Sequence, residues 1–257
     1  MISNVFTGIC YGPVDSRRLG RSLGVNFTAG GPKACSYDCP YCDLGPTSMR
    51  LNRVKKDVPF PTPAEILLVL TDALRATRDR SEVLDSICIS GNGEPTLHPD
   101  FSEAVDAVLA ARTAVWPALR VSILTNGANA ETRPVRFALG RLDDRMLKLD
   151  AGNERVFKAM NGPLARTTLA KVISNARVLE SVTIQTMFVS GAVDNTLQPD
   201  LEDWIEAVAI IKPKAVHLVG LNRAPWTPGL VRLDEDALYV IASKLERRTQ
   251  IKALVFP

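Results

Sequence analysis

The chain has 257 residues, of which 46% are hydrophobic and 23% charged, and its formal net charge is +3. This composition is that of a globular protein with one large core, and so small a charge does not by itself indicate a nucleic-acid partner. No apolar run approaches the roughly 18 residues that suggest a membrane span. Five cysteines, in a chain of this length with no apolar signal peptide at its start, predict a reducing, cytoplasmic location rather than a disulfide framework.

The first segment, residues 1–21, is marked by Arg17, Arg18 and Arg21, which stand within five residues of one another. A guanidinium group binds carboxylates and phosphates through paired hydrogen bonds. These arginines are therefore candidates for holding an anionic group of a small substrate. The alternative is an exposed loop whose arginines pair with nearby carboxylates.

Six apolar runs of strand length follow, and a helical pattern comes after each of them. The runs cover residues 22–27, 84–90, 119–125, 146–151, 182–189 and 215–221. Because they are continuous apolar stretches, as in buried parallel strands, they predict an α/β fold with a parallel sheet curved into a partial (β/α)6 barrel of the TIM-barrel-like kind. Helix starts carry capping signals, such as Thr62-Pro63-Ala64-Glu65. The whole chain is predicted to be one domain, in which residues 22–221 form the core and residues 222–257 a C-terminal helix and tail.

The loop after the first run contains Cys35, Cys39 and Cys42 in the pattern C-x3-C-x2-C. Three thiolates at this spacing can hold a [4Fe–4S] cluster and leave one iron without a protein ligand, whereas clusters that only transfer electrons take four cysteines. A zinc site is the alternative, and it would need a fourth ligand. The candidates for that ligand are Cys10, Cys88, His98 and His217.

This loop, with Tyr41 directly before its third cysteine, resembles the signature of the radical S-adenosylmethionine (radical SAM) superfamily. The resemblance implies that the amino and carboxylate groups of SAM chelate the open iron. It implies that a reduced cluster cleaves SAM to methionine and a 5′-deoxyadenosyl radical, which abstracts hydrogen from a substrate. It also implies oxygen sensitivity and a one-electron donor such as flavodoxin or ferredoxin.

A second motif, Gly91-Asn92-Gly93-Glu94-Pro95, follows the second run. It resembles the GGEP motif of the same superfamily, with Asn92 in place of a glycine, and that motif receives the amino end of SAM. Glycines let a backbone approach a ligand closely, and Glu94 supplies an acceptor for an ammonium group. Taken alone, the same five residues would be an ordinary turn.

The remaining strand ends add candidates by the same resemblance. Positions where the superfamily contacts the ribose, the methionine carboxylate, the substrate or adenine are occupied here by Tyr41, Asn126, Asp150, Gln185, Met187 and Leu221. Asn126, Asp150 and Gln185 could each instead cap a strand, and Met187 could instead fill the core. Lys148 in the fourth run and Trp226 after the sixth are candidate substrate contacts.

Over almost its full length the chain resembles the branch of the superfamily that is grouped with wyosine-base tRNA synthases. Those enzymes hold a second cluster on three upstream cysteines and use an upstream lysine, whereas this chain has only Cys10 and Lys33 there. A second cluster of that kind is therefore not expected. Three functions stay open: a radical SAM enzyme acting on a small anionic substrate, a tRNA-modifying enzyme that uses the basic stretch 50–56, and a non-catalytic iron–sulfur or zinc module.

Overall fold

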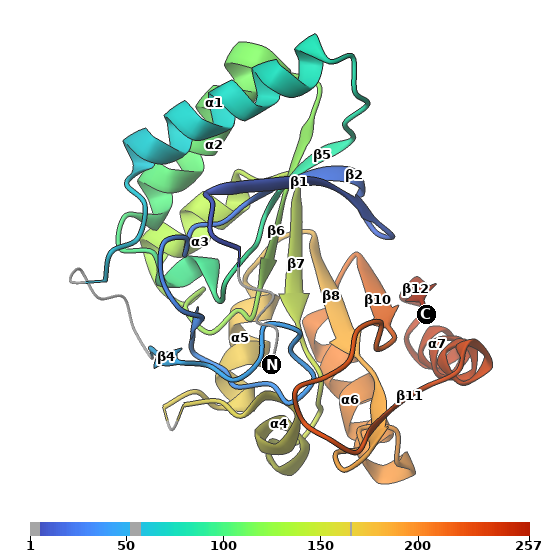
Figure 1. The fold of residues 1–257 in the computed structure, drawn as a ribbon. Helices are drawn as coiled ribbons and strands as arrows, with labels where there is room; N and C mark the ends of the chain where they lie inside the picture. Colours follow the sequence, from blue (N-terminus) through green and yellow to red (C-terminus); the bar gives the residue numbers. More distant parts are fainter. Residues whose placement is uncertain (1–5, 52–57, 165) are drawn as a thin grey trace.

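The computed structural model describes residues 6–51, 58–164 and 166–257. Its main element is an eight-stranded sheet in the order β1-β2-β5-β6-β7-β8-β10-β12, which curls into a half barrel (Figure 1). The strands are β1 Cys10–Ser16, β2 Gly20–Val25, β5 Ser86–Ile89, β6 Arg120–Thr125, β7 Asp144–Lys148, β8 Val182–Met187, β10 Ala215–Val219 and β12 Ala253–Phe256. From β2 to β12 neighbouring strands are parallel. The α/β fold class and the six predicted strands are confirmed, with bounds that differ by a few residues.

Helices connect the strands and lie along the outside of the curved sheet, with α1 and α2 side by side beyond β5 (Figure 1). They are α1 Pro63–Asp79, the short 3-10 helix η1 Pro95–Leu97, α2 Phe101–Val115, α3 Arg133–Gly140, α4 Glu154–Asn161, α5 Leu169–Arg177, α6 Gln198–Ile211 and α7 Glu235–Thr249. The predicted capping box opens α1, because Thr62 Oγ1 accepts the Glu65 N–H (3.2 Å) and Glu65 accepts the Thr62 N–H (2.7 Å).

The outer face of the sheet is apolar. Leu23, Ile87 and Val121 are in-register neighbours on β2, β5 and β6 and are buried in one core with Leu70 of α1 and Val108 of α2. Since parallel strands covered by helices bury this face completely, the core lies between the sheet and its helices.

The inner face, by contrast, carries small and polar side chains beside apolar ones such as Leu124 and Met146. Gly24, Cys88 and Ser122 are in-register neighbours on this face. Tyr11 of β1 lies across it, since a Cβ atom at Gly24 would be 2.1 Å from the Tyr11 ring, and the Tyr11 hydroxyl is 2.6 Å from Ser90 Oγ. The inner face is therefore mixed instead of apolar throughout, and its small side chains leave room inside the half barrel.

Both ends of the chain contribute strands that the sequence did not predict. β1, within residues 1–21, is antiparallel to β2, and β12, within the predicted tail, pairs in parallel with β10. Two small sheets lie in loops: β3 Ala34–Cys35 pairs with β4 Met49–Arg50, and β9 Val189–Gly191 pairs with β11 Leu230–Arg232. Among the helices of the described residues, none has the length and apolar character that crossing a membrane would require.

Candidate active site

The cysteine loop and the glycine-rich motif are joined by their backbones. The loop runs from β2 to α1, and β3 and β4 close its base. Ala34 donates its N–H to the Asn92 carbonyl (2.9 Å), and its own carbonyl accepts the Glu94 N–H (3.0 Å). A Cβ atom at Gly93, where φ is +144°, would lie only 1.7 Å from the Ala34 carbonyl oxygen. Glycine at this position is therefore what allows the two motifs to meet.

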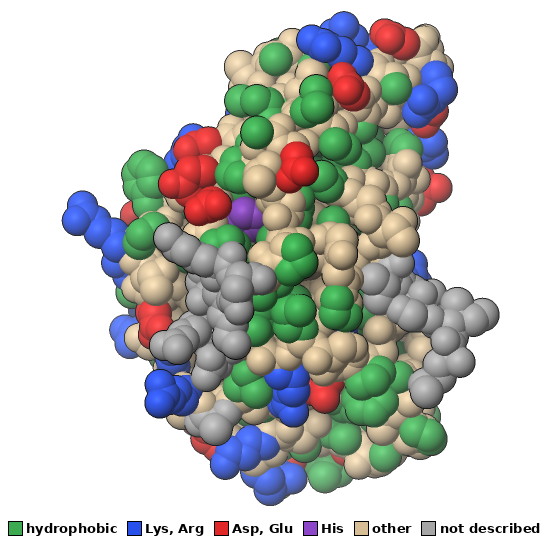
Figure 2. Space-filling view, turned by 60° about the vertical axis from the view of Figure 1, so that its left-hand side comes forward, with side chains coloured by type: hydrophobic (Ala, Val, Ile, Leu, Met, Phe, Trp, Pro, Cys, Tyr) green, Lys and Arg blue, Asp and Glu red, His purple; other side chains and the backbone are tan. Residues whose placement is uncertain are grey.

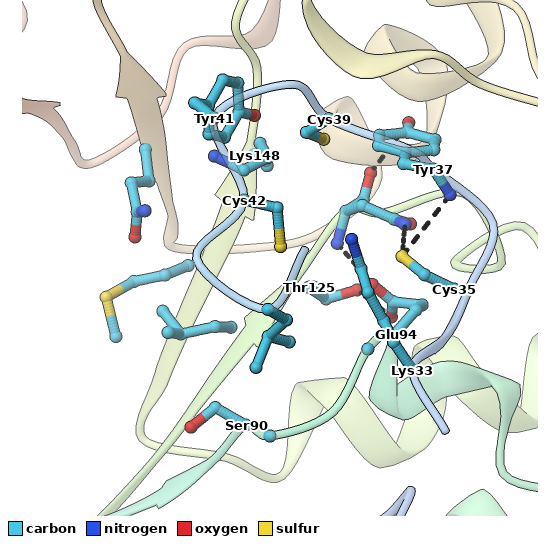
Figure 3. Close-up of a pocket in the computed structure, with 17 residues that line it drawn as sticks. Lys33, Cys35, Tyr37, Cys39, Tyr41, Cys42, Ser90, Glu94, Thr125 and Lys148 are labelled. Atoms are coloured by element: carbon cyan, nitrogen blue, oxygen red, sulfur yellow. Dashed lines mark hydrogen bonds between the residues drawn. The ribbon is translucent and has the colours of Figure 1, made fainter. Parts of the chain in front are cut away.

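The three thiols of this loop surround one cavity of about 230 Å³ (Figure 3). The Cys35 sulfur accepts the Tyr37 N–H (3.4 Å), and the Cys39 sulfur accepts a hydrogen from the Asn161 side-chain amide (3.5 Å). Burial raises the pKa of the Cys39 thiol to about 11 and also raises that of Cys35. Because burial disfavours the charged form, a thiolate at this site needs a hydrogen-bond donor or a metal ion to stabilise it. The N–H donors named above, or a bound metal, provide this stabilisation.

Glu94 lies at the edge of the same cavity and is almost fully buried. Its carboxylate accepts hydrogen bonds from the Thr96 and Thr125 hydroxyls (both 2.6 Å), from the Thr96 N–H (3.1 Å) and from the Asn126 N–H (2.7 Å). Burial raises the pKa of Glu94, while these hydrogen bonds oppose the rise. Three of the four donors reach Oε1 and one reaches Oε2, so Oε2 keeps acceptor capacity for a ligand.

Lys148 brings a positive charge to the opposite wall of the cavity. Its ammonium group lies 3.5 Å from the Asp150 carboxylate and 4.8 Å from the centre of the Tyr41 ring. The Tyr41 hydroxyl donates to Asp150, and the Asn161 amide donates to the same carboxylate at 2.6 Å. These contacts hold Lys148 in place beside the cysteine loop (Figure 3).

Comparison with protein-family models shows the class of protein to which this chain belongs. The model of the Radical SAM superfamily matches residues 32–212, which is more than half of the chain. The chain belongs to the radical SAM superfamily. It is therefore a member of an enzyme class, and the non-catalytic module predicted as an alternative is wrong.

Individual relatives are similar over parts of their length. The chain is 30% identical to the GTPase Obg of Brachyspira hyodysenteriae over 225 residues, which are 86% of this chain and 31% of that protein. It is 32% identical to the UPF0026 protein MJ1312 of Methanocaldococcus jannaschii over 165 residues, which are 64% of this chain and 47% of that protein. The chain thus spans less than half the length of these two curated relatives.

Solved structures share the fold. A radical SAM methyltransferase from Sphaerobacter thermophilus has a TM-score of 0.68 at 17% identity and aligns with 91% of this chain and 65% of its own. The structure of TYW1 with a lysine-pyruvate adduct bound has a TM-score of 0.66 at 15% identity and aligns with 90% of this chain and 75% of its own. At such identities the likeness shows the radical SAM fold and not a branch of the superfamily.

The radical SAM superfamily implies a [4Fe–4S] cluster and SAM, and the thiols of this chain fit a cluster. In such a cluster each thiolate binds a different iron, so the sulfurs must surround a space instead of meeting at one point. Cys35, Cys39 and Cys42 do so from a single loop, and two of them receive N–H donors. Within the described ranges no group of three His, Cys, Asp or Glu side chains is arranged to hold a single metal ion.

The other cofactor-binding predictions divide into two groups. Those that line the cavity are Tyr41, Gly91, Gly93, Glu94, Asn126 and Gln185. Those that do not line it are Asn92, Asp150, Met187 and Leu221. The Asn92 side chain instead binds the backbone of Phe6 (2.6 and 2.8 Å), and Asp150 acts on the cavity through Tyr41 and Lys148.

The substrate predictions need correction. Arg21 pairs with Glu82 (2.9 Å) and lies 3.6 Å from Asp15, as in the exposed-loop alternative. The Arg17 guanidinium donates to the side-chain oxygen of Asn222 (2.8 Å) when that amide is oriented toward it. Only Arg18 points into the half barrel, where it donates to Gln185. The structure therefore does not bring the three guanidinium groups together around one position, and Arg18 is the one that stays a candidate for an anion inside the half barrel.

Trp226 also differs from its prediction. Its indole N–H donates to the Cys39 carbonyl (2.9 Å), so it holds the cysteine loop from outside the cavity and does not line it. Two other residues at the site were missed as site residues. Lys33 is buried at the cavity wall and donates to the Gly45 carbonyl (2.7 Å), and Asn161 reaches Cys39 from the end of α4.

Proposed function

We propose that this radical SAM enzyme binds a [4Fe–4S] cluster on Cys35, Cys39 and Cys42, cleaves SAM reductively and abstracts hydrogen from a small anionic substrate. The observation that supports this most is the single cavity of about 230 Å³ on which the three thiols, the glycine-rich motif and a lysine converge. When bound, the cluster and SAM supply a 5′-deoxyadenosyl radical. The protein has to bind and orient SAM and the substrate, and it has to exclude water from the site.

The residues of the cavity provide matching groups for SAM. Glu94 Oε2 offers an acceptor to the ammonium group of SAM, beside the backbone of Gly91 and Gly93. Lys148 offers its positive charge to a carboxylate, and Asn126, whose amide donates to Ser36 Oγ (2.9 Å), holds the wall next to Cys35. These roles follow from charge and hydrogen-bonding chemistry at the cavity.

A small substrate is favoured over tRNA by the position of the charges. Arg18 lies inside the half barrel, where a polynucleotide backbone would not reach, whereas Arg50 is exposed and donates to the Gly162 carbonyl (2.9 Å). Residues 52–56 of the basic stretch 50–56 lie outside the described residues, so the part of this stretch in RNA binding stays a prediction. On the described part of the face in Figure 2, lysines and arginines stand in separate groups with acidic and hydrophobic side chains between them, and form no continuous band.

The experiment is a SAM cleavage assay on anaerobically reconstituted protein. With dithionite, or with a flavodoxin or ferredoxin as electron donor, we expect 5′-deoxyadenosine and methionine to form. Cys35→Ala, Cys39→Ala and Cys42→Ala should abolish both iron binding and cleavage. Cys10→Ala and Cys88→Ala are the matched controls and should retain both, because neither thiol lines the cavity. A protein with a full complement of iron that forms no 5′-deoxyadenosine would overturn the proposal.

A further inference from the structure

A second cavity, of about 310 Å³, adjoins the first inside the half barrel. It lies between the amino ends of β7, β8 and β10 and the turn that joins β1 to β2, and Met146 lines both cavities. Arg18 lines the second cavity and donates to Gln185, which lines the first. The Arg18–Gln185 contact therefore lies where the two cavities meet.

The charges that line this second cavity are mostly positive. Arg18, Lys214 and Lys252 face one carboxylate, Asp144. That carboxylate is already bound by Lys214 (2.9 Å) and by Arg120 (3.0 Å) from outside the cavity. Among the described residues, no carboxylate lies within ion-pair distance of the Arg18 guanidinium. A cavity in which positive side chains outnumber negative ones attracts anions.

Arg18 is the least exposed of these cations, because it is partly buried whereas Lys214 and Lys252 are exposed. Burial lowers the pKa of Arg18, the direction expected where a charge leaves water without a partner. Among the described residues, the Arg18 guanidinium makes one hydrogen bond, and it goes to the neutral amide of Gln185. A guanidinium has five N–H donors, so most of them remain for a planar or tetrahedral oxyanion.

His217 lines the same cavity as Arg18 and is close enough for the charge of that guanidinium to act on its ring. It is in register with Gln185 on the neighbouring strand, so the two side chains share the inner face of the sheet. Its Nδ1 atom is buried without a hydrogen-bond partner among the described residues. Burial, and then the charge of Arg18, lower the pKa of His217 to about 4, so the ring is neutral at pH 7 and can share a hydrogen with a ligand.

We infer that the second cavity binds the oxyanion group of the substrate, a carboxylate or a phosphate, at Arg18 and His217, while the rest of the substrate passes Met146 into the cavity of the cysteines. This inference rests on the proposed function, because it places the reacting carbon beside SAM. It identifies Arg18 as the residue that selects an anionic substrate. Lys214 and Lys252 lie in the same cavity and attract the anion toward it.

The test follows the ring signals of the histidines by NMR, since the chain has only two, His98 and His217. Both ring nitrogens of His98 already have partners, the Pro61 carbonyl (2.7 Å) and the Asp100 N–H (3.1 Å), so its signal serves as an internal control. Acetate and inorganic phosphate are the two probes. Either should shift the His217 signal and raise its pKa, because an anion at Arg18 offsets the guanidinium charge. Which probe binds more tightly distinguishes a carboxylate from a phosphate substrate.

Variants at adjacent positions make the test specific. Arg18→Gln should weaken binding of the probe by about tenfold or more, since a charge-assisted hydrogen bond is lost, and should by itself raise the pKa of His217. Arg17→Gln removes the same charge one residue away, on an exposed side chain, and should leave the response unchanged. Arg18→Lys keeps the positive charge but loses the paired N–H donors of the guanidinium, so it should bind the probe with intermediate affinity. This variant replaces Arg18→Gln if Arg18→Gln does not fold.

The inference is overturned if neither probe moves the His217 signal of the wild-type chain, or if Arg17→Gln weakens the response as much as Arg18→Gln. Its failure is distinguishable from failure of the proposed function. A chain that cleaves SAM but binds neither probe beside His217 keeps the SAM cleavage of the proposed function and loses the second cavity as a substrate site. A chain that binds the probes at Arg18 but never cleaves SAM loses the proposed function instead.

Discussion

Exchange of Glu94 for glutamine tests how SAM is held, because it changes one acceptor and little else. The carboxylate accepts four hydrogen bonds in a buried site, three at Oε1 and one at Oε2. A glutamine amide has only one acceptor oxygen, which the three donors at the Oε1 position will occupy. Its NH2 group then faces both the Asn126 N–H and the ammonium group of SAM. The stability loss from one unpaired buried N–H is about 1 to 3 kcal/mol.

The loss of SAM affinity should be larger. An ammonium group that loses its charged acceptor in an enclosed site costs about 2 to 4 kcal/mol, a factor of roughly 30 to 900 in the dissociation constant. Calorimetric titration of the anaerobically reconstituted Glu94→Gln variant measures this, together with its iron content. Glu103→Gln, at an exposed position on α2, is the matched control. If Glu94→Gln binds SAM like the wild-type protein with its iron intact, Glu94 only supports the turn and our reasoning is refuted.

Three further changes test the framework of the site. Asn161→Ala removes a hydrogen bond to the Cys39 sulfur and should lower the midpoint potential of the cluster in an EPR-monitored redox titration; an unchanged potential would show that this contact does not tune the cluster. Gly93→Ala places a Cβ atom 1.7 Å from a backbone oxygen of the cysteine loop and should abolish iron binding, whereas Gly31→Ala, which meets nothing within 4 Å, should not. Burial acts to raise the pKa of Asp144, but hydrogen bonds from two cations hold it at about 2. Its folded-state pKa is thus depressed, so its contribution to stability is present above the ordinary value of 3.8 and declines as the pH falls towards about 2. Asp144→Asn should therefore cost about 1 to 2 kcal/mol in urea unfolding at pH 7, after allowance for solvent screening, and much less at pH 2.5; an equal loss at both pH values would contradict the assignment.

The sequence predicted the strands of the half barrel well because burial under helices leaves a clear apolar pattern. β1 was missed because Gly12 and Pro13 interrupt its seven residues, and β12 because its four residues follow the last helix and resemble a tail. Neither segment carries a periodic signal of its own, and each becomes a strand by pairing with a neighbour that is already in the sheet.

The site was predictable only where its residues stand close together in the sequence. The three cysteines and Gly91 to Glu94 are local motifs, and their backbones were expected at strand ends. Asn161 and His217 reach the interior through α4 and β10, which no spacing reveals. The arginines show the converse error, since Arg17, Arg18 and Arg21 are close in sequence but a tight turn sends their side chains to three different partners.

The most direct test of the account is the EPR spectrum of the dithionite-reduced, anaerobically reconstituted protein with and without SAM. We predict about four irons per chain and a cluster signal that changes when SAM is added, because three thiolates leave one iron open to a ligand. Stoichiometric zinc without iron, or a cluster whose signal is indifferent to saturating SAM, would contradict it.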